Sequence, residues 1–295
     1  MQKIFTKYRQ EINYSQIQKE VNNLIEKARA IESNEVKKEL FSFIDLTFLS
    51  VKDSYKSIRR VVEKVNQVKH KFDIDNVAGV CVYPRFVETV RTNLTNKDVR
   101  VVSVAAGFPA SQTFAEVKRL ETELAVRYGA DEVDIVISVG EFFEENYELV
   151  YNEVKELKQI AGDRIIKVIL ETGTLNDFTL IYKASILAME GGADFIKTST
   201  GKEKIGARPE AGYVMVMAIK DFYKVSGKQV GFKPAGGVSN SATALIYYTI
   251  VKEVLGEQWL RSNLFRIGSS GLANNLLKEL GYVEKEFFSS SAGGY

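Results

Sequence analysis

The sequence predicts an α/β protein: a single (β/α)8 TIM barrel with an N-terminal helical extension. Apolar, strand-like runs alternate with amphipathic helical patterns eight times along the chain, without an interrupting linker or internal repeat. The length of 295 residues also fits, because an α/β barrel of roughly 250 residues forms one domain. Eight consecutive units favour a closed parallel barrel over an open doubly wound sheet.

Three segments are expected along the chain. Residues 1–40 form the helical extension, in which apolar side chains recur on one face at Ile17, Val21, Leu24, Ile25 and Ala28. Residues 41–283 form the barrel. Residues 284–295 form a tail of flexible composition, rich in serine and glycine, which ends in Tyr295. We therefore expect an added helix packed on the main body and a flexible C-terminal tail.

The first half of the barrel contains four predicted strand and helix pairs. The strands are predicted at residues 40–47, 77–83, 99–106 and 130–137. The helices are predicted at residues 55–68, 85–93, 114–128 and 142–160. Each strand is a short apolar run, and each helix repeats apolar residues every three or four positions. In the third helix this stripe consists of Phe114, Val117, Leu120, Leu124 and Tyr128.

The second half continues the same alternation. Its strands are predicted at residues 164–170, in the run that closes at Lys197, at residues 229–233 and at residues 264–268. Its helices are predicted at residues 175–190, 209–223, 241–255 and 271–280. Pro209 supports the start of the sixth helix, because proline suits the first helical turn.

Composition argues against several classes of function. Lys plus Arg exceed Asp plus Glu by only two (40 against 38), and no basic cluster is interleaved with aromatic residues. A nucleic acid partner is therefore not expected. The chain also has no run of about eighteen consecutive apolar residues that would predict a membrane span. We expect a cytoplasmic protein without a membrane partner.

Two rare residues limit the chemistry. His70, the only histidine, lies in a strongly charged segment, which argues against histidine-ligated metal and against a Ser-His or Cys-His pair. Cys81, the only cysteine, lies in an apolar run where a buried thiol is the commoner state. No metal is predicted, so any reaction depends on Lys, Asp, Glu, Tyr or Cys side chains.

Lys197 ends an apolar strand and is followed at once by a polar turn that closes at Gly201. Strand alternation places Lys197 on the same face as Phe195 and Ser199. Burial there would disfavour the charged amine and make it a usable nucleophile. The alternative is a lysine that extends its ammonium group out of the strand end into water.

Four ionisable residues occupy strand positions where apolar residues would otherwise be expected: Asp45, Asp134, Lys197 and Lys233. A charged Lys233 on the neighbouring strand would lower the pKa of Lys197, and a neutral Lys197 could attack a carbonyl. Asp134, alone or through a water, suits the accompanying proton transfers, although it could instead form an interior ion pair. Asp45 and Thr47 could hold a substrate hydroxyl.

A phosphate site is predicted from two glycine-rich loops. Barrels often bind phosphate with the loops after strands seven and eight, which here are residues 234–237 and 268–271. The second loop leads directly into a helix, whose N-terminal N–H groups attract anions. Lys202 would add a cation beside Gly201, unless it is only a solvated loop charge.

These motifs closely resemble the deoxyribose-phosphate aldolase family. The most specific matches are residues 192–202, 230–237 and 131–134. Further matches lie at residues 45–47, 81–86, 167–173 and 268–270. The resemblance covers residues 40–295 in unbroken order. It implies a class I aldolase that reversibly cleaves 2-deoxyribose 5-phosphate to acetaldehyde and glyceraldehyde 3-phosphate in deoxyribonucleotide catabolism.

The resemblance also implies roles for individual residues. Lys197 corresponds to the Schiff-base lysine, so no cofactor other than this covalent imine is expected; Lys233 tunes it and Asp134 relays protons. Tyr295 corresponds to a terminal tyrosine that assists proton transfer. The substrate-binding set is Asp45, Thr47, Thr200, Gly201, Lys202, Gly236, Gly237, Ser269 and Ser270. The partner is a phosphorylated sugar, and a homodimer is expected; residues 1–40 are longer than in compact bacterial members.

Two other functions fit parts of the pattern. One is a barrel enzyme, such as an isomerase or decarboxylase, that acts on a sugar phosphate without an imine and uses both lysines only as cations. The other is a catalytically silent barrel that binds a phosphorylated metabolite. Trapping of a covalent adduct on Lys197 separates the aldolase from the first, and turnover separates it from the second.

Overall fold

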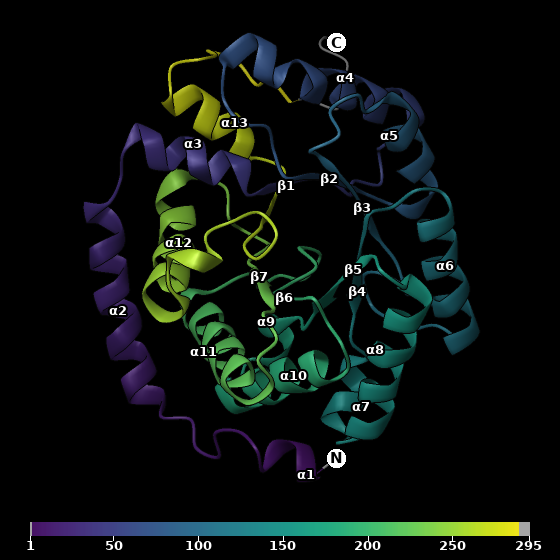
Figure 1. Cartoon of the computed structure of the whole chain (residues 1–295), viewed down its shortest axis with the longest axis vertical. Coiled ribbons are helices and arrows are strands. Elements are labelled where there is room, and N and C mark those ends of the chain that lie inside the picture. The colour runs from purple at the N-terminus through teal and green to yellow at the C-terminus, as the bar shows by residue number, and fades with distance from the viewer. Residues whose placement is uncertain (1, 289–295) are drawn as a thin grey trace.

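The computed structural model describes residues 2–288, in which eight parallel strands form a ring inside a layer of helices (Figure 1). The strands are β1 (Ile44–Phe48), β2 (Gly79–Val82), β3 (Arg100–Val104), β4 (Glu132–Val136), β5 (Ile165–Ile169), β6 (Phe195–Lys197), β7 (Gly231–Lys233) and β8 (Ile267–Ser269). Their order in the sheet is β7-β6-β5-β4-β3-β2-β1-β8. Parallel bridges from Phe232 to Phe265 and from Ala235 to Gly268 join the two ends. The predicted barrel is confirmed.

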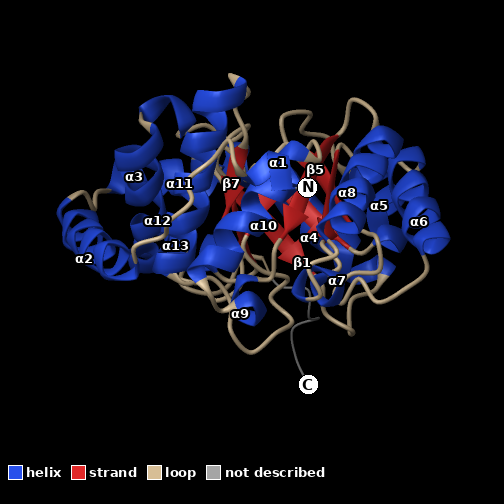
Figure 2. Cartoon of the chain, turned by 90° about the horizontal axis from the view of Figure 1, so that it is seen from below, coloured by secondary structure: helices blue, strands red, loops and turns tan. Residues whose placement is uncertain are grey.

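Helices surround the strands in the order expected of a (β/α)8 barrel, and the side view in Figure 2 places the strands at the centre. The barrel helices are α4 (Tyr55–Phe72), α5 (Val87–Asn93), α6 (Ala115–Arg127), α7 (Val139–Phe143), α8 (Tyr147–Ala161), α9 (Thr172–Leu175), α10 (Phe178–Glu190), α11 (Pro209–Ser226), α12 (Ser241–Leu255) and α13 (Leu272–Glu279). Short 3-10 turns lie at Pro84–Phe86 and Glu257–Trp259. None of the helices within residues 2–288 has the length and apolar character of a membrane span.

The N-terminal segment contributes three helices: α1 (Gln2–Phe5), α2 (Tyr14–Ala30) and α3 (Asn34–Ser42). Helix α2 runs along the outside of α11 and α12, at the left of Figure 1. Its buried face is formed by Ile17, Val21, Leu24 and Ala28. These are four of the five residues that the helical spacing identified, so the added helix is confirmed.

Helix α3 extends into residues that were expected to begin the first strand. The hydroxyl of Ser33 accepts from the backbone N–H of Val36 and caps the helix, which buries Leu40 and Phe41 before it ends at Ser42. Strand β1 therefore starts at Ile44 rather than at residue 40. Periodicity cannot separate a short apolar strand from the last turn of a buried helix, which explains the error.

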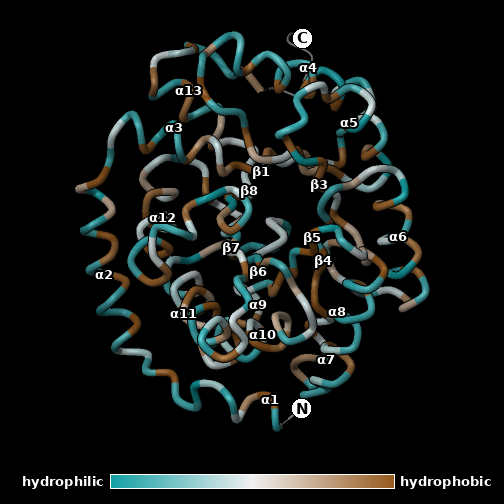
Figure 3. The backbone as a smooth tube through the Cα atoms, viewed as in Figure 1, coloured by the Kyte–Doolittle hydropathy of each residue, from teal (hydrophilic) through white to brown (hydrophobic). Residues whose placement is uncertain are grey.

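Helix α6 turns its apolar stripe toward solvent. Phe114 is 79% exposed, and Val117, Leu120 and Tyr128 are about half exposed. The buried face instead consists of Lys118, Thr122 and Ala125. Lys118 donates its amine to Ser138 Oγ at 2.8 Å and to Glu153 Oε1 at 2.5 Å, which fixes α6 against α8. Hydrophilic and hydrophobic segments alternate along the outer helices in Figure 3. In α6, the exposure of Val117 and Leu120 shows that hydrophobic side chains face solvent.

The last described residues pack on the barrel. Phe287 and Phe288 are buried, and Phe288 exchanges two hydrogen bonds with the side chain of Asn274 at 2.7 and 2.9 Å. The segment expected to be a flexible tail is therefore packed at Phe287 and Phe288. Tyr295 lies outside the described residues.

Candidate active site

The four ionisable strand residues meet inside the barrel. Asp45 on β1, Asp134 on β4, Lys197 on β6 and Lys233 on β7 are each 2% exposed or less. Lys197 and Lys233 are direct register partners across β6 and β7. Oδ2 of Asp134 accepts from Lys197 Nζ at 2.8 Å and from Lys233 Nζ at 2.7 Å. Two amines thus share a single carboxylate oxygen.

Asp45 is a second carboxylate in contact with Lys233. Its Oδ2 accepts from Lys233 Nζ at 2.5 Å, and its Oδ1 accepts from Arg266 Nη1 at 2.5 Å. Lys167 Nζ lies 3.4 Å from Oδ2. Since cations surround both oxygens, Asp45 belongs to the interior ion network and does not line the cavity described below.

Three members of this network were not among the sequence candidates: Glu132, Lys167 and Arg266. Lys167 Nζ contacts Glu132 Oε2 at 2.5 Å and Asp134 Oδ1 at 3.1 Å. Arg266 Nη2 donates to Glu132 Oε1 at 2.7 Å. The signal was available, because each is a charged residue within an apolar strand-like run. Buried charges of this kind require partners, and these three complete the network.

The network holds an excess of one cation. Its cationic side chains are Lys167, Lys197, Lys233 and Arg266, and its carboxylates are Asp45, Glu132 and Asp134. A net charge is costly in a low-dielectric interior, so losing one proton balances the set. Lys197 is the amine best placed to lose it: it contacts one carboxylate, whereas Lys233 contacts two and Lys167 contacts three.

Local electrostatics agree with this assignment. Burial lowers the pKa of Lys197, and the charge of Lys233 lowers it further, against the opposing effect of Asp134. Burial also disfavours the charged form of Lys233, but Asp134 and Asp45 outweigh it and raise the pKa of Lys233. Despite its burial, Asp134 has a pKa well below the usual range because Lys167, Lys197 and Lys233 surround it. The pair therefore consists of one amine that loses its proton readily and one that retains it.

A cavity of about 780 Å³ opens above Lys197. Lys197 is part of its wall, and eight of the predicted substrate-binding residues line it: Thr47, Thr200, Gly201, Lys202, Gly236, Gly237, Ser269 and Ser270. Asp134 and Lys233 lie behind Lys197 and do not reach the wall. The amine of Lys197 is thus the part of the ion network that a molecule in this cavity can touch.

The far side of the cavity is built from backbone turns. Gly201, Gly236 and Gly237 have φ values of 75°, 84° and 86°, in the left-handed region that glycine adopts most readily. Ser269 Oγ accepts from the N–H of Leu272 at 3.0 Å at the start of α13. Exposed N–H groups in such turns and at a helix N-terminus attract anions.

Cys81 lies close enough to the network to be affected by it. The thiol is fully buried, and burial, together with the charge of Asp134, raises its pKa to about 11. It is therefore protonated at neutral pH, as expected for a buried thiol. Within residues 2–288, no group of three or more His, Cys, Asp or Glu side chains is arranged to hold a metal ion.

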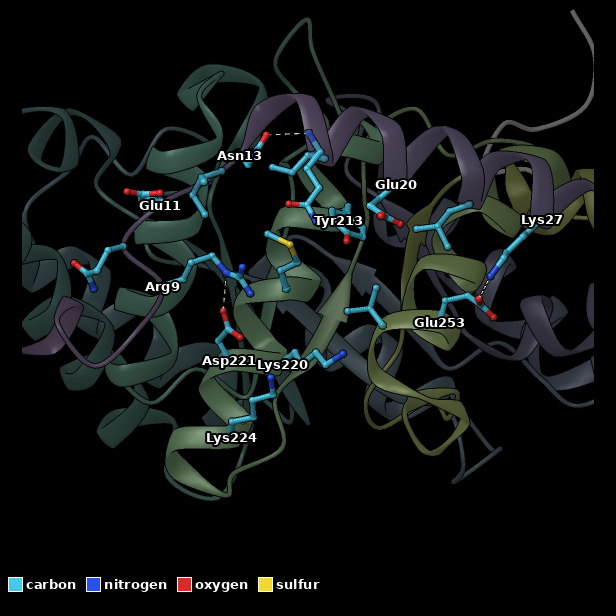
Figure 4. Close-up of a pocket in the computed structure, with 17 residues that line it drawn as sticks. Arg9, Glu11, Asn13, Glu20, Lys27, Tyr213, Lys220, Asp221, Lys224 and Glu253 are labelled. Carbon is cyan, nitrogen blue, oxygen red and sulfur yellow. Dashed lines mark hydrogen bonds and ion pairs between the residues drawn. The ribbon is translucent and has the colours of Figure 1, made fainter.

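A second cavity, of about 880 Å³, lies between the N-terminal segment and α11 and α12 (Figure 4). Its charged side chains are of both signs and several are paired, for example Arg9 with Asp221 at 3.1 Å and Lys27 with Glu253. It contains none of the predicted site residues. The cavity above Lys197 is therefore the candidate active site.

Fold and site together define a barrel enzyme with a desolvated lysine at the carboxyl ends of its strands, where such barrels place their chemistry. The profile of the DeoC/LacD aldolases matches residues 40–254. Mouse deoxyribose-phosphate aldolase is 40% identical over 250 residues, covering 81% of this chain and 79% of the mouse protein. The human deoxyribose-phosphate aldolase is 40% identical over 251 residues, with the same coverage. The chain belongs to the DeoC/LacD family of aldolases.

Solved structures agree with this fold. An aldolase named QR15 superimposes with a TM-score of 0.67 at 29% identity, covering 83% of this chain and 99% of that one. The tetrameric deoxyribose phosphate aldolase of Aeropyrum pernix superimposes with a TM-score of 0.69 at 22% identity, covering 88% and 97%. At that identity the second comparison supports the fold alone.

Proposed function

We propose that the protein is a class I deoxyribose-phosphate aldolase, which reversibly cleaves 2-deoxyribose 5-phosphate to acetaldehyde and glyceraldehyde 3-phosphate. The observation that carries the proposal is the buried amine of Lys197, which lies between the ion network and the cavity. The mouse and human relatives bear the name of this activity, which supports the choice of substrate.

The first step is attack of the neutral Lys197 amine on C1 of the open-chain sugar. One proton moves from nitrogen to the carbonyl oxygen during the attack, and a second is added to that oxygen as it departs as water, which leaves a protonated imine. Asp134 hydrogen-bonds Lys197 Nζ at 2.8 Å and is the nearest described group to move these protons, directly or through a water. Lys233 remains charged and keeps the free amine neutral.

The second step breaks the bond between C2 and C3. The protonated imine accepts the electron pair of the C2–C3 bond while the C3 hydroxyl passes its proton through a water to Asp134, so glyceraldehyde 3-phosphate leaves and an enamine of acetaldehyde remains on Lys197. Protonation of the enamine carbon and hydrolysis release acetaldehyde. We assign the carbon protonation to Tyr295, which corresponds by resemblance to the family's tyrosine.

The phosphate group fits the turns opposite Lys197. Gly201, Gly236 and Gly237 supply exposed backbone, Ser269 and Ser270 supply hydroxyls, and Lys202 supplies a cation on the same wall. This arrangement supports a substrate with an anion at one end and a carbonyl at the other. Thr47 and Thr200 line the space between the two ends, and Asp45 is proposed to act on a substrate hydroxyl only indirectly, through the network.

We further propose that the protein is a homodimer that pairs through α6. The exposed apolar stripe on this helix supports the assignment. An antiparallel, two-fold pairing of two α6 helices would bring Phe114 near Tyr128 of the second copy and Glu116 near its Arg127, so apolar side chains and opposite charges would face each other. The apolar side chains would then be buried.

Borohydride trapping tests the proposed reaction. The protein is incubated with acetaldehyde or 2-deoxyribose 5-phosphate, reduced, digested and mapped by mass spectrometry. A stable adduct on Lys197 is expected, absent from Lys197→Ala. Turnover without an adduct would instead indicate an enzyme that uses both lysines only as cations. Phosphate binding without turnover would indicate a metabolite-binding barrel.

A further inference from the structure

A buried carboxylate lies at the end of β5, outside the ion network. Glu171 is 4% exposed, and within residues 2–288 it forms no ion pair. Thr200 is the donor in all three of its hydrogen bonds. The N–H of Thr200 lies 3.3 and 3.2 Å from the two carboxylate oxygens, and its hydroxyl donates to Oε2 at 2.5 Å. An acid without a cation is costly to bury, so these bonds require an explanation.

The backbone at Glu171 is held in an unusual conformation. Its φ of 53° and ψ of 58° lie in the left-handed region, which is strained for a non-glycine residue and recurs at functional sites. Both neighbours bond to the segment that contains the reactive lysine: the N–H of Leu170 donates to Lys197 O, and the N–H of Thr172 donates to Thr198 O, each at 2.9 Å. The carboxylate is thereby aimed at the loop that follows Lys197.

The bonds from Glu171 continue toward the cavity wall. The hydroxyl of Thr200 also accepts from the N–H of Lys202 at 3.1 Å, and the amine of Lys202 donates to the carbonyl of Leu49. Gly201 and Lys202, which line the cavity, thus follow directly from the residue that Glu171 holds. The carboxylate reaches the wall only through Thr200.

The turn after β5, which contains Glu171, also fixes the far end of the loop that follows Lys197. A Cβ at Gly173 would lie 2.1 Å from the carbonyl oxygen of Ile205, so only glycine allows the two backbones to approach this closely. Contacts at Thr200 and Ile205 therefore bracket the segment between them. The turn after β5 sets the shape of the loop after β6.

We propose that Glu171 is a positioning residue for phosphorylated substrate: it fixes Thr200, and through Thr200 the backbone of Gly201 and Lys202, in the arrangement that receives the phosphate. A carboxylate suits this role because it only accepts, so both Thr200 donors are satisfied and no donor of its own is left buried. The inference rests on the proposed aldolase function and concerns the phosphate end of the site alone.

The test separates the phosphate end from the imine end. In Glu171→Ala, KM for 2-deoxyribose 5-phosphate should rise about tenfold or more, since hydrogen bonds to a buried charge are lost. The rate of imine formation with acetaldehyde, which has no phosphate, should stay within about twofold of the unmodified enzyme. The KM of Glu171→Gln should lie between the values of the unmodified enzyme and Glu171→Ala, because the carbonyl oxygen of glutamine still accepts but its amide is buried without a partner.

Two variants of Thr200 test whether Glu171 acts through it. Thr200→Val removes the hydroxyl and should also raise KM, and Thr200→Ser should restore it. In the double variant Glu171→Ala/Thr200→Val, the fold-increase in KM should be much smaller than the product of the fold-increases in the two single variants. Thermal melting of each variant identifies loss of fold. If Glu171→Ala does not fold, Thr200→Val and Thr200→Ser decide the question.

Equal loss of imine formation with both substrates, or an unchanged KM for the phosphorylated sugar, would overturn the inference. Failure of the proposed function has a different signature. In that case the unmodified protein itself would show no adduct on Lys197, whereas failure of the inference would leave that adduct intact and only the KM effect missing.

Discussion

The side-chain amines of Lys197 and Lys233 share one acceptor, Oδ2 of Asp134, at 2.8 and 2.7 Å. Two ammonium groups on one oxygen repel each other, so protonation of one disfavours protonation of the other. Lys233 contacts a second carboxylate, Asp45, at 2.5 Å, whereas Lys197 contacts Asp134 and no second carboxylate among the described residues. This asymmetry decides which amine gives up its proton, and several of the expectations below depend on it.

Replacing Lys233 should remove the cause of the low pKa at Lys197. In Lys233→Leu the network has three cations and three carboxylates, so Lys197 is expected to retain its proton. Only the neutral amine attacks, so the acidic limb of the rate profile should move to higher pH. Turnover at neutral pH should fall about tenfold for each unit by which the pKa of Lys197 rises. The pH dependence of turnover and of borohydride trapping measures this shift.

Lys233→Arg is the matched control for that experiment. It retains a cation at the same strand position, so any loss of turnover should not be accompanied by an upward shift of the profile. A Lys233→Leu enzyme with an unchanged pH profile would contradict the role of like charge at Lys197.

Removing the carboxylate of Glu132, which contacts Lys167 and Arg266, should destabilise the fold. Glu132→Gln leaves Arg266 and Lys167 with fewer carboxylates and raises the excess of buried positive charge, which we expect to cost about 3–5 kcal/mol of unfolding free energy. Denaturant unfolding at neutral pH measures this. The double variant Glu132→Leu/Arg266→Met removes one charge of each sign, so it should be more stable than the single variant. The reverse order would show that charge balance does not govern this region.

Substitution in the exposed stripe should change the oligomeric state. Leu120→Lys places a charge at the centre of the proposed α6 interface and should shift the protein to monomer in sedimentation velocity at micromolar concentration. Val225→Lys is the control, because Val225 is similarly exposed (51%) but lies on α11. A dimer that persists in Leu120→Lys, or that Val225→Lys also dissociates, would assign the interface elsewhere.

Removing Tyr295 should affect carbon protonation specifically. The truncated enzyme is expected to incorporate deuterium from solvent into bound acetaldehyde more slowly, because the enamine carbon loses its proposed acid. Inhibition by inorganic phosphate should be unchanged, since the groups proposed to bind the phosphate are Gly201, Lys202, Gly236, Gly237, Ser269 and Ser270. A weaker phosphate inhibition with normal deuterium exchange would indicate a role in binding instead.

The fold, and the burial of Lys197 at the end of its strand, could be predicted from the sequence. Alternating apolar runs and helical stripes determine strands and helices locally, and eight such units close into a ring. Charged residues at apolar strand positions identified Asp45, Asp134, Lys197 and Lys233 because burial makes such residues exceptional. The glycines that line the cavity after β7 and β8 were identified by their place in the chain. Periodicity was insufficient at α3, where helix and strand patterns coincide.

Other features were decided only by the tertiary structure, because they depend on which side chains meet across the barrel. The excess of one cation becomes visible when Glu132, Lys167 and Arg266 are found beside the predicted residues. The outward face of α6 follows from the pairing of Lys118 with Glu153, which sets the rotation of the helix. Sequence determines periodicity along one element; distances and charge balance between elements are determined only when the ring closes.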